Sequence, residues 1–287
     1  MKIGILVDSS AGIIEKNIES KIIKVIPLHL IVEDKDDFFD TAENIENNNL
    51  IDILKANKKT STSQASPGEL MNKYDEMLKE FDHIIHLTIP SNLSGMHETA
   101  VMVSKDDEYM GKVTVIKHSL AANTVKYLAF KYNEMINNGE REPSKFQQEA
   151  DLWKDGTFIS IIPGDFQKLA KGGRAKSLLV TILKMIKTKV AIHWLEKPKK
   201  LGLGRTYGAV LEKIYFPLSN EMKNSYELLI VYLNEASIKV TDQVKNFFNE
   251  KKVSFTIEEI PTVFPWHAGV DTIGIIAIEK SLMPKNK

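Results

Sequence analysis

The chain has 287 residues, of which 43% are hydrophobic and 26% charged, as is usual for a soluble globular protein. Its 38 Lys and Arg residues balance 38 Asp and Glu residues, so no net charge attracts nucleic acid or an anionic membrane. The absence of cysteine excludes disulfides and thiolate chemistry. No apolar run reaches the length of a membrane span, and the sequence enters a strand without a signal peptide. We therefore expect a cytoplasmic protein of one or two domains.

The first segments predict buried strands that alternate with helices. Residues 2–7 form a continuous apolar run, typical of a central parallel strand, and the run ends at Asp8. The Asp8 carboxylate is either functional or a cap for the next turn. Residues 22–32 predict a second strand region, which Pro27 interrupts. An acidic exposed turn is expected at 33–40 and a modest helix at 42–57.

A hydroxyl-rich stretch at 59–66 is expected to be a loop that opens a helix. Ser66 and Glu69 have the spacing of a capping box around Pro67 at the first helical position. The cap accounts for these residues but not for the hydroxyl side chains before them. Those side chains are either ordinary loop polarity or donors that converge on an anion, and they comprise Thr60, Ser61, Thr62 and Ser63.

The central feature of the sequence is a tight turn between a strand at 83–89 and a helix at 95–105. Ser94 lies in this turn, at the carboxyl end of the strand and the amino end of the helix. Open parallel sheets bind ligands at that position, and the free N–H groups of the helix favour an anion. The alternative is that Ser94 is a plain N-cap.

The remaining pattern predicts an α/β fold in two domains. A strand at 113–116, a helix at 119–138 and a helix that a capping box at Ser144 opens complete a doubly wound parallel domain over residues 1–155. Residues 156–287 predict a second α/β domain, whose sheet direction stays open. Its expected strands are 157–163, 189–196, 226–234, 254–260 and 273–279, and its expected helices are 165–171, 178–186, 207–216 and 237–249.

Five short motifs in order give the chain a resemblance to the DegV family of bacterial fatty-acid-binding proteins. The motifs are Asp8-Ser9-Ser10, Thr62-Ser63-Gln64-Ala65-Ser66-Pro67, Pro90-Ser91-Asn92-Leu93-Ser94-Gly95-Met96, Lys171-Gly172-Gly173-Arg174-Ala175 and His267-Ala268-Gly269-Val270-Asp271. The sequence departs from the family pattern at Ala65, Pro90, Met96 and Val270-Asp271. The resemblance implies two α/β domains with a ligand enclosed between them.

The resemblance implies a long-chain fatty acid such as palmitate, stearate or oleate as ligand, and no cofactor. Burial of the tail contributes about 0.8 kcal/mol per methylene, and the carboxylate needs donors because an unpaired buried charge is costly. Thr62 and Ser94 are the expected carboxylate ligands, with Ser63 as a helper and N–H groups at Gly95. Arg174 and His267 are expected near the head group; their alternatives are a surface Arg after a helix and a packed imidazole. Candidates for the lining of the tunnel are Met71, Met96, Leu120, Phe158 and Ile192, although a plain core role is the favoured alternative for each.

The family also includes carrier subunits of fatty acid kinase, which present the carboxylate to a separate ATP-dependent subunit. Arg205 matches an exposed basic position of the family and is expected either to contact that subunit or the transferred phosphate, or to be an ordinary surface Arg. A lipid buffer without a kinase partner is equally consistent with the sequence.

Other classes of site find less support. Glycines at 202, 204 and 208 miss the dinucleotide-binding spacing by one residue, and no clear strand leads into them. Neither a phosphate loop nor a metal-ligand motif is present. The rival enzyme is a serine hydrolase that uses Ser94 with His97 or His267 as base and Asp8 as the orienting acid, but the chain lacks a nucleophile-elbow motif.

Overall fold

The computed structural model describes residues 1–171, 188–194, 196–222 and 225–285. The N-terminal half of the chain is built around a parallel sheet. All neighbouring strands of this sheet are parallel. The strand order is β2 (Ile23–Ile26), β1 (Ile3–Asp8), β6 (His83–Leu87) and β7 (Val113–Val115). Every residue of β1 is buried, as its continuous apolar run predicts.

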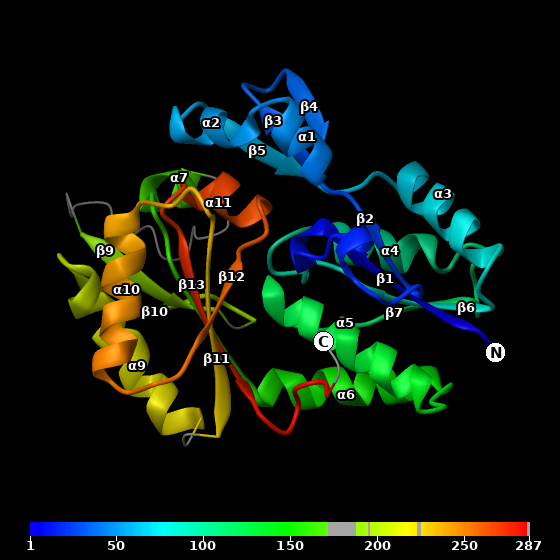
Figure 1. The fold of residues 1–287 in the computed structure, drawn as a ribbon. Helices are drawn as coiled ribbons and strands as arrows, with labels where there is room; N and C mark the ends of the chain where they lie inside the picture. Colours follow the sequence, from blue (N-terminus) through cyan, green and yellow to red (C-terminus); the bar gives the residue numbers. More distant parts are fainter. Residues whose placement is uncertain (172–187, 195, 223–224, 286–287) are drawn as a thin grey trace.

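Helices cover both faces of this sheet, which confirms the doubly wound prediction (Figure 1). One face packs on α3 (Pro67–Leu78) and α4 (Met96–Val103), with Leu6 and Ile84 in the shared core. The opposite face packs on α5 (Asn123–Asn137), and α6 (Pro143–Asp155) packs on α5. The carboxyl ends of β1 and β6 therefore lie near the ends of the covering helices. The turns that contain Asp8 and Ser94 follow these two strand ends.

Two helix predictions need correction. The helix expected at 42–57 is split into α1 (Ala42–Asn47) and α2 (Leu50–Lys55), because Asn49 takes a left-handed φ of 49°. The capping box predicted at Ser144 does not form. The cap residue of α6 is Glu142, and the side chain of Gln147 instead bonds both backbone groups of Lys117, at 3.0 and 2.8 Å.

A small antiparallel sheet, missed by the sequence analysis, lies at the top of Figure 1. Its strand order is β4 (Asp36–Phe39), β3 (His29–Val32) and β5 (Thr60–Ser63). The region 22–32 thus contributes β2 to one sheet and β3 to another. The predicted turn is confined to residues 33–35 and the predicted loop to residues 59 and 64–66. Pairing with β3 makes strands of the remainder, β4 and β5.

The C-terminal half holds a six-stranded mixed sheet. Its order is β10 (Lys199–Gly204), β9 (Lys189–His193), β8 (Thr157–Ile162), β13 (Ile273–Glu279), β11 (Tyr226–Tyr232) and β12 (Thr256–Glu259). Neighbouring strands are antiparallel except for the parallel pair β11 and β12. All five strands expected in this half are present, and β10 is an additional one. The chain therefore has an N-terminal parallel α/β half and a separate C-terminal α/β domain.

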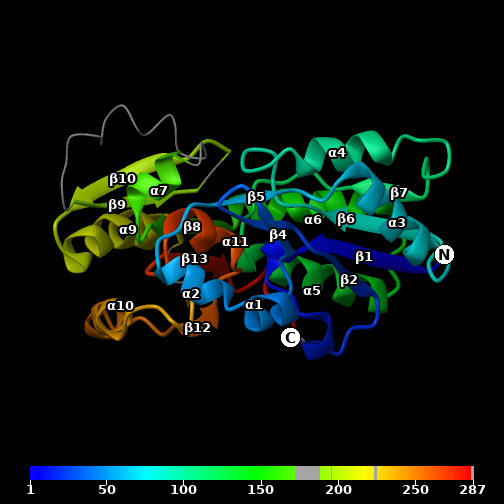
Figure 2. The ribbon, with the colours of Figure 1, turned by 90° about the horizontal axis from the view of Figure 1, so that it is seen from above.

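The two faces of this sheet have different neighbours. One face packs on α9 (Tyr207–Met222) and α10 (Ile238–Glu250), at the left of Figure 1. The other face shares a core with α5, α6 and β1. The short helices α7 (Phe166–Lys171) and α11 (Val263–Ala268) lie beside each other near the small sheet (Figures 1 and 2). The helix expected at 178–186 lies outside the described residues.

The glycines at 202 and 204 have a packing role. They belong to β10, so the expectation that no strand leads into this glycine cluster is wrong. A Cβ atom at Gly202 would lie 2.5 Å from the side chain of Lys213, and one at Gly204 would lie 2.8 Å from that of Val210. Both contacts are with α9, and β10 is an antiparallel edge strand. A dinucleotide fingerprint needs a parallel βαβ unit, so this cluster does not provide one.

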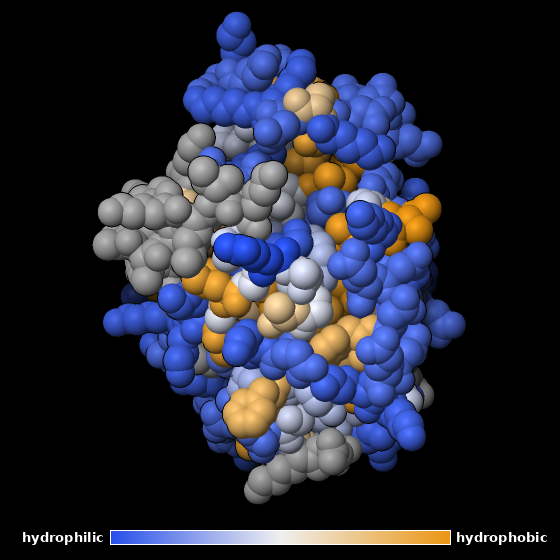
Figure 3. All heavy atoms as spheres, turned by 90° about the vertical axis from the view of Figure 1, so that its left-hand side faces the viewer, coloured by the Kyte–Doolittle hydropathy of each residue, from blue (hydrophilic) through white to orange (hydrophobic). Residues whose placement is uncertain are grey.

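Figure 3 shows the face of the molecule that lies at the left of Figure 1. This face is mainly hydrophilic, with hydrophobic residues in separate small groups. Phe216 of α9 and Ile238 of α10 are among the exposed large hydrophobic residues. Within the described residues, no helix combines the length and the apolar character that a membrane crossing requires.

Candidate functional site

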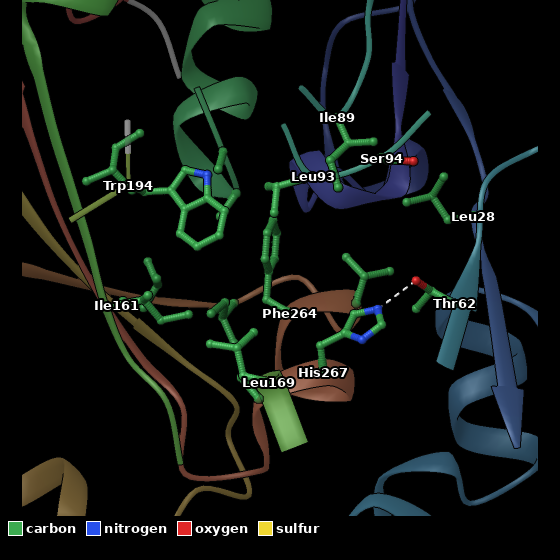
Figure 4. A pocket seen from close by; sticks show the side chains of 18 of the residues that line it. Leu28, Thr62, Ile89, Leu93, Ser94, Ile161, Leu169, Trp194, Phe264 and His267 are labelled. Carbon is green, nitrogen blue, oxygen red and sulfur yellow. Dashed lines mark hydrogen bonds between the residues drawn. The ribbon is translucent and has the colours of Figure 1, made fainter. Parts of the chain in front are cut away.

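A pocket lies between the N-terminal elements and the inner face of the C-terminal sheet (Figure 4). It contains about 890 Å³ of space between protein atoms, including a part open to solvent. Most lining residues are apolar. The N-terminal half supplies Leu28, Thr62, Ser63, Gln64, Ile89, Leu93, Ser94, Ala121 and Ala122, and the C-terminal half supplies Ile159, Ser160, Ile161, Leu169, Trp194, Val231, Ile260, Val263, Phe264, His267, Ala268, Gly274 and Ile276.

One end of the pocket is polar because β5 docks on α11. Thr60 Oγ1 donates a hydrogen bond to the Trp266 carbonyl at 2.7 Å, and the Trp266 indole N–H donates to the Ser61 carbonyl at 3.0 Å. This docking brings Thr62 Oγ1 to 2.7 Å from His267 Nε2, although 205 residues separate the two in sequence. A hydroxyl and an imidazole from opposite halves of the chain thus meet at the pocket wall.

Ser94 approaches the same end from the turn after β6, as Figure 4 shows. Its Oγ accepts a hydrogen bond from the Met96 N–H at 3.2 Å, so its own proton remains available to donate. Gly95, not Ser94, is the cap residue of α4. A Cβ atom at Gly95 would lie 2.9 Å from Gln64 Oε1, so a larger residue here would displace the Gln64 side chain.

The Asp8 carboxylate fixes this turn. It accepts hydrogen bonds from the backbone N–H groups of Ser10, at 3.0 Å, and Ile89, at 2.5 Å. Burial raises the pKa of Asp8 to about 6 despite these bonds. Asp40, also buried, accepts a bond from Ser9 Oγ at 2.7 Å, and burial raises its pKa to about 6 as well. Asp8 therefore caps η1 (Ser9–Ala11) and links β1 to the Ser94 turn.

The structure brings together four of the predicted site residues. Thr62, Ser63, Ser94 and His267 all line the pocket. Ser63 is exposed, and its Oγ donates to the Gln64 carbonyl at 3.3 Å. Gly95 does not line the pocket but lies behind Gln64.

The basic residues predicted for function lie elsewhere. Arg174 is outside the described residues. Arg205 is exposed between β10 and α9 and does not line the pocket. The five tunnel candidates also fail to line it. They pack in the hydrophobic cores instead, because periodicity shows that a residue is buried but not what it faces, and they are Met71, Met96, Leu120, Phe158 and Ile192.

Several apolar lining residues were missed by the sequence analysis. Leu28 follows the Pro27 break, while Trp194 and Phe264 lie just after β9 and within α11. Phe264 and Leu93 lie between the polar end and Trp194 in Figure 4. The aromatic character of Phe264-Pro265-Trp266 was the only signal for this wall. It identified an apolar neighbourhood for His267 but not a cavity.

The geometry does not assemble the hydrolase triad. Asp8 bonds Ser10 and Ile89 and has no histidine partner. His97 Nδ1 lies 3.4 Å from Thr88 Oγ1, and the hydrogen bond of Ser94 is to Met96. Among the residues that the structure describes, no group of three or more His, Asp or Glu side chains is arranged to hold a metal ion.

Comparisons with known proteins agree with this architecture. A family model described as "Uncharacterised protein, DegV family" matches residues 2–280. A fatty acid-binding protein of Thermotoga maritima is 26% identical over 283 residues, which cover 96% of each chain.

Solved structures show the same fold. A structure entitled fatty acid binding of a DegV family protein, from Thermus thermophilus, has a TM-score of 0.82 at 20% identity and covers 97% of this chain and all of that one. A stearic acid-binding protein of Eubacterium ventriosum has a TM-score of 0.81 at 17% identity and covers 97% and 98% of the two chains. On the family match over nearly its whole length, the chain belongs to the DegV family.

Proposed function

We propose that the protein binds a long-chain fatty acid in this pocket, with the carboxylate at the end formed by Thr62, Ser94 and His267. The observation that supports the proposal is that the pocket combines these polar side chains with an otherwise mostly apolar lining. A buried tail contributes about 0.8 kcal/mol per methylene, and the carboxylate requires donors where it leaves water. The names of the related proteins support the same ligand class.

The predicted head-group residues have different roles. The Ser94 hydroxyl donates to one carboxylate oxygen, and the hydrogen-bonded Thr62–His267 pair supplies a donor to the other. Ser63, at the pocket rim, is a secondary donor, and Gly95 allows Gln64 to pack against the turn. Arg174 is assigned as a nearby cation on its motif alone. No cofactor takes part, and palmitate, stearate and oleate are the expected ligands.

Organic extraction of the denatured, purified protein, followed by mass spectrometry, tests the ligand. We expect near-stoichiometric fatty acid, and its loss in a protein that carries both Ser94→Ala and Thr62→Ala. Circular dichroism of that variant provides the folding control. A folded wild-type protein that contains no lipid and takes up neither palmitate nor oleate would overturn the proposal.

We further propose that the protein is a non-catalytic carrier that presents the bound carboxylate to an ATP-dependent fatty acid kinase subunit in the cytoplasm. Acyl-phosphate formation depends mainly on positioning and on charge stabilisation, which a carrier can supply without covalent participation. Residues 1–155 and 156–287 would be the two domains that enclose the lipid. Exposed Arg205, which lies away from the pocket, is assigned to the contact with the kinase subunit or the transferred phosphate.

Arg205→Ala separates carrying from presentation. Lipid affinity should be unchanged, while phosphorylation of the bound acid by a kinase subunit and ATP should slow. Lys200→Ala, a matched loss of positive charge in the same strand region, is the control. A large loss of lipid affinity in Arg205→Ala would contradict the assignment. No phosphorylation with any kinase subunit would instead favour a lipid buffer.

A further inference from the structure

Trp194 lines the pocket, and its indole N–H is an unsatisfied donor among the residues that the structure describes. Trp194 follows β9, and its backbone N–H donates to the Ile159 carbonyl at 2.8 Å. The residue is 7% exposed and lines the pocket, yet its Nε1 is buried and has no hydrogen-bond partner within the described part of the chain. The other two tryptophans differ. Trp153 Nε1 donates to Glu149 at 3.0 Å, and Trp266 Nε1 donates to the Ser61 carbonyl.

An unpaired indole N–H is unfavourable in an apolar wall. The group loses its hydrogen bonds to water on burial and gains none in return, and a buried tryptophan usually finds an acceptor. A phenylalanine at this position would give a similar apolar surface without that penalty. The donor therefore has an energetic reason to pair with something that enters the pocket.

The position of Trp194 separates it from the head group. Figure 4 shows the indole on the side opposite Thr62 and His267, with Phe264 and Leu93 between them. A fatty acid whose carboxylate lies at the polar end would pass Trp194 with its tail. A plain saturated tail offers no acceptor there, so it would leave the N–H as it is.

We propose that the pocket is matched to an acyl chain that carries an oxygen acceptor along its length, a hydroxy or oxo fatty acid, with Trp194 Nε1 as the donor that recognises it. This inference rests on the proposed function, because it takes the carboxylate to lie at the Thr62 end. In this proposal Trp194 determines the selectivity between acyl chains, and the residues at the Thr62 end of the pocket determine the affinity for the carboxylate.

Competition between stearate and its hydroxylated forms tests the assignment. The lipid-free protein is titrated with stearate, 10-hydroxystearate, 12-hydroxystearate and oleate, and dissociation constants are compared. We expect one hydroxystearate to bind more tightly than the other, and its preference over stearate to fall about fivefold in Trp194→Phe, as for one hydrogen bond of ~1 kcal/mol. The preference is expressed relative to stearate in the same variant, so that the change of apolar surface at Trp194 cancels. Trp153→Phe, which removes an indole outside the pocket, is the matched control.

Three results would overturn the proposal. The first is that neither hydroxystearate binds more tightly than stearate. The second is that the preference for a hydroxystearate persists in Trp194→Phe. The third is that only oleate loses affinity in the variant, which would mean that the N–H meets a double bond. Failure of all four acids to bind would instead count against the proposed function. If the variant does not fold, the indole ¹H–¹⁵N resonance of wild-type Trp194 decides. It should move downfield with the preferred hydroxystearate and not with stearate.

Discussion

Replacement of Thr62 by valine tests the head-group geometry most directly. Valine keeps the shape of threonine but removes Oγ1, which lies 2.7 Å from His267 Nε2 and faces the pocket. A hydrogen bond to a charged group is worth ~1.5–3 kcal/mol, so the affinity for palmitate should fall about 10- to 150-fold. The fold should tolerate the change, because the backbone pairing of β5 with β3 is untouched.

The assay compares two ligands of equal chain length. Palmitate and hexadecanol are titrated into lipid-free wild-type and Thr62→Val protein by calorimetry. Hexadecanol carries no charge, so its affinity should fall by less than about tenfold, the range for a neutral hydrogen bond. Ser61→Ala, a hydroxyl loss in the same strand away from the pocket, is the matched control. Equal losses for the two ligands would refute a carboxylate at this position.

Three further predictions concern the surroundings of the pocket. Gly95→Ala should lower lipid affinity several-fold, because its Cβ would lie 2.9 Å from Gln64 Oε1; an added Gln64→Ala should restore affinity, and no restoration would contradict this steric account. Ala122→Gly should raise the free energy of unfolding by ~1 kcal/mol, since Ala122 has a φ of 55° that glycine adopts freely. Ala121→Gly should not stabilise, and urea titration of both variants measures the difference. For Asp40, whose folded pKa of about 6 exceeds its ordinary 3.8, the folded state binds a proton more tightly than the unfolded state. Stability should therefore fall as pH rises from about 4 to 6, and Asp40→Asn should show a weaker pH dependence in urea titrations, because only the contribution of Asp8, whose pKa is also about 6, is left; identical pH profiles would contradict it.

Local patterns were sufficient to predict most of the two large sheets and the capping box of α3. Ser66 Oγ accepts from the Glu69 N–H at 3.2 Å, and the Ser66 N–H donates to Glu69 at 2.7 Å. Such caps depend on neighbours in sequence. The small sheet was missed because its strands depend on a distant partner: polar β5 and charged β4 are held by pairing with β3. A propensity for strand is weak information when pairing decides the outcome.

The candidate site was predictable in part for the same reason. The motifs identified Thr62, Ser94 and His267, but they carried no information on the distances between these residues. Their proximity depends on the docking of β5 against α11, which no local pattern encodes. The apolar wall was not predicted, because the sequence shows that Trp194 and Phe264 are hydrophobic but not that they border a cavity rather than fill a core.

The contact between Thr62 and His267 also has a consequence for folding during synthesis. His267 follows Thr62 by 205 residues, and domains generally fold in N-terminal order during synthesis. The parallel sheet, the Ser94 turn and β5 can therefore form on the ribosome while the opposite wall of the pocket does not yet exist. A nascent chain would hold its pocket-facing residues without a partner surface. Under the proposed function, lipid capture should consequently begin only after synthesis has passed His267, and retained lipid would report that both walls of the pocket have folded.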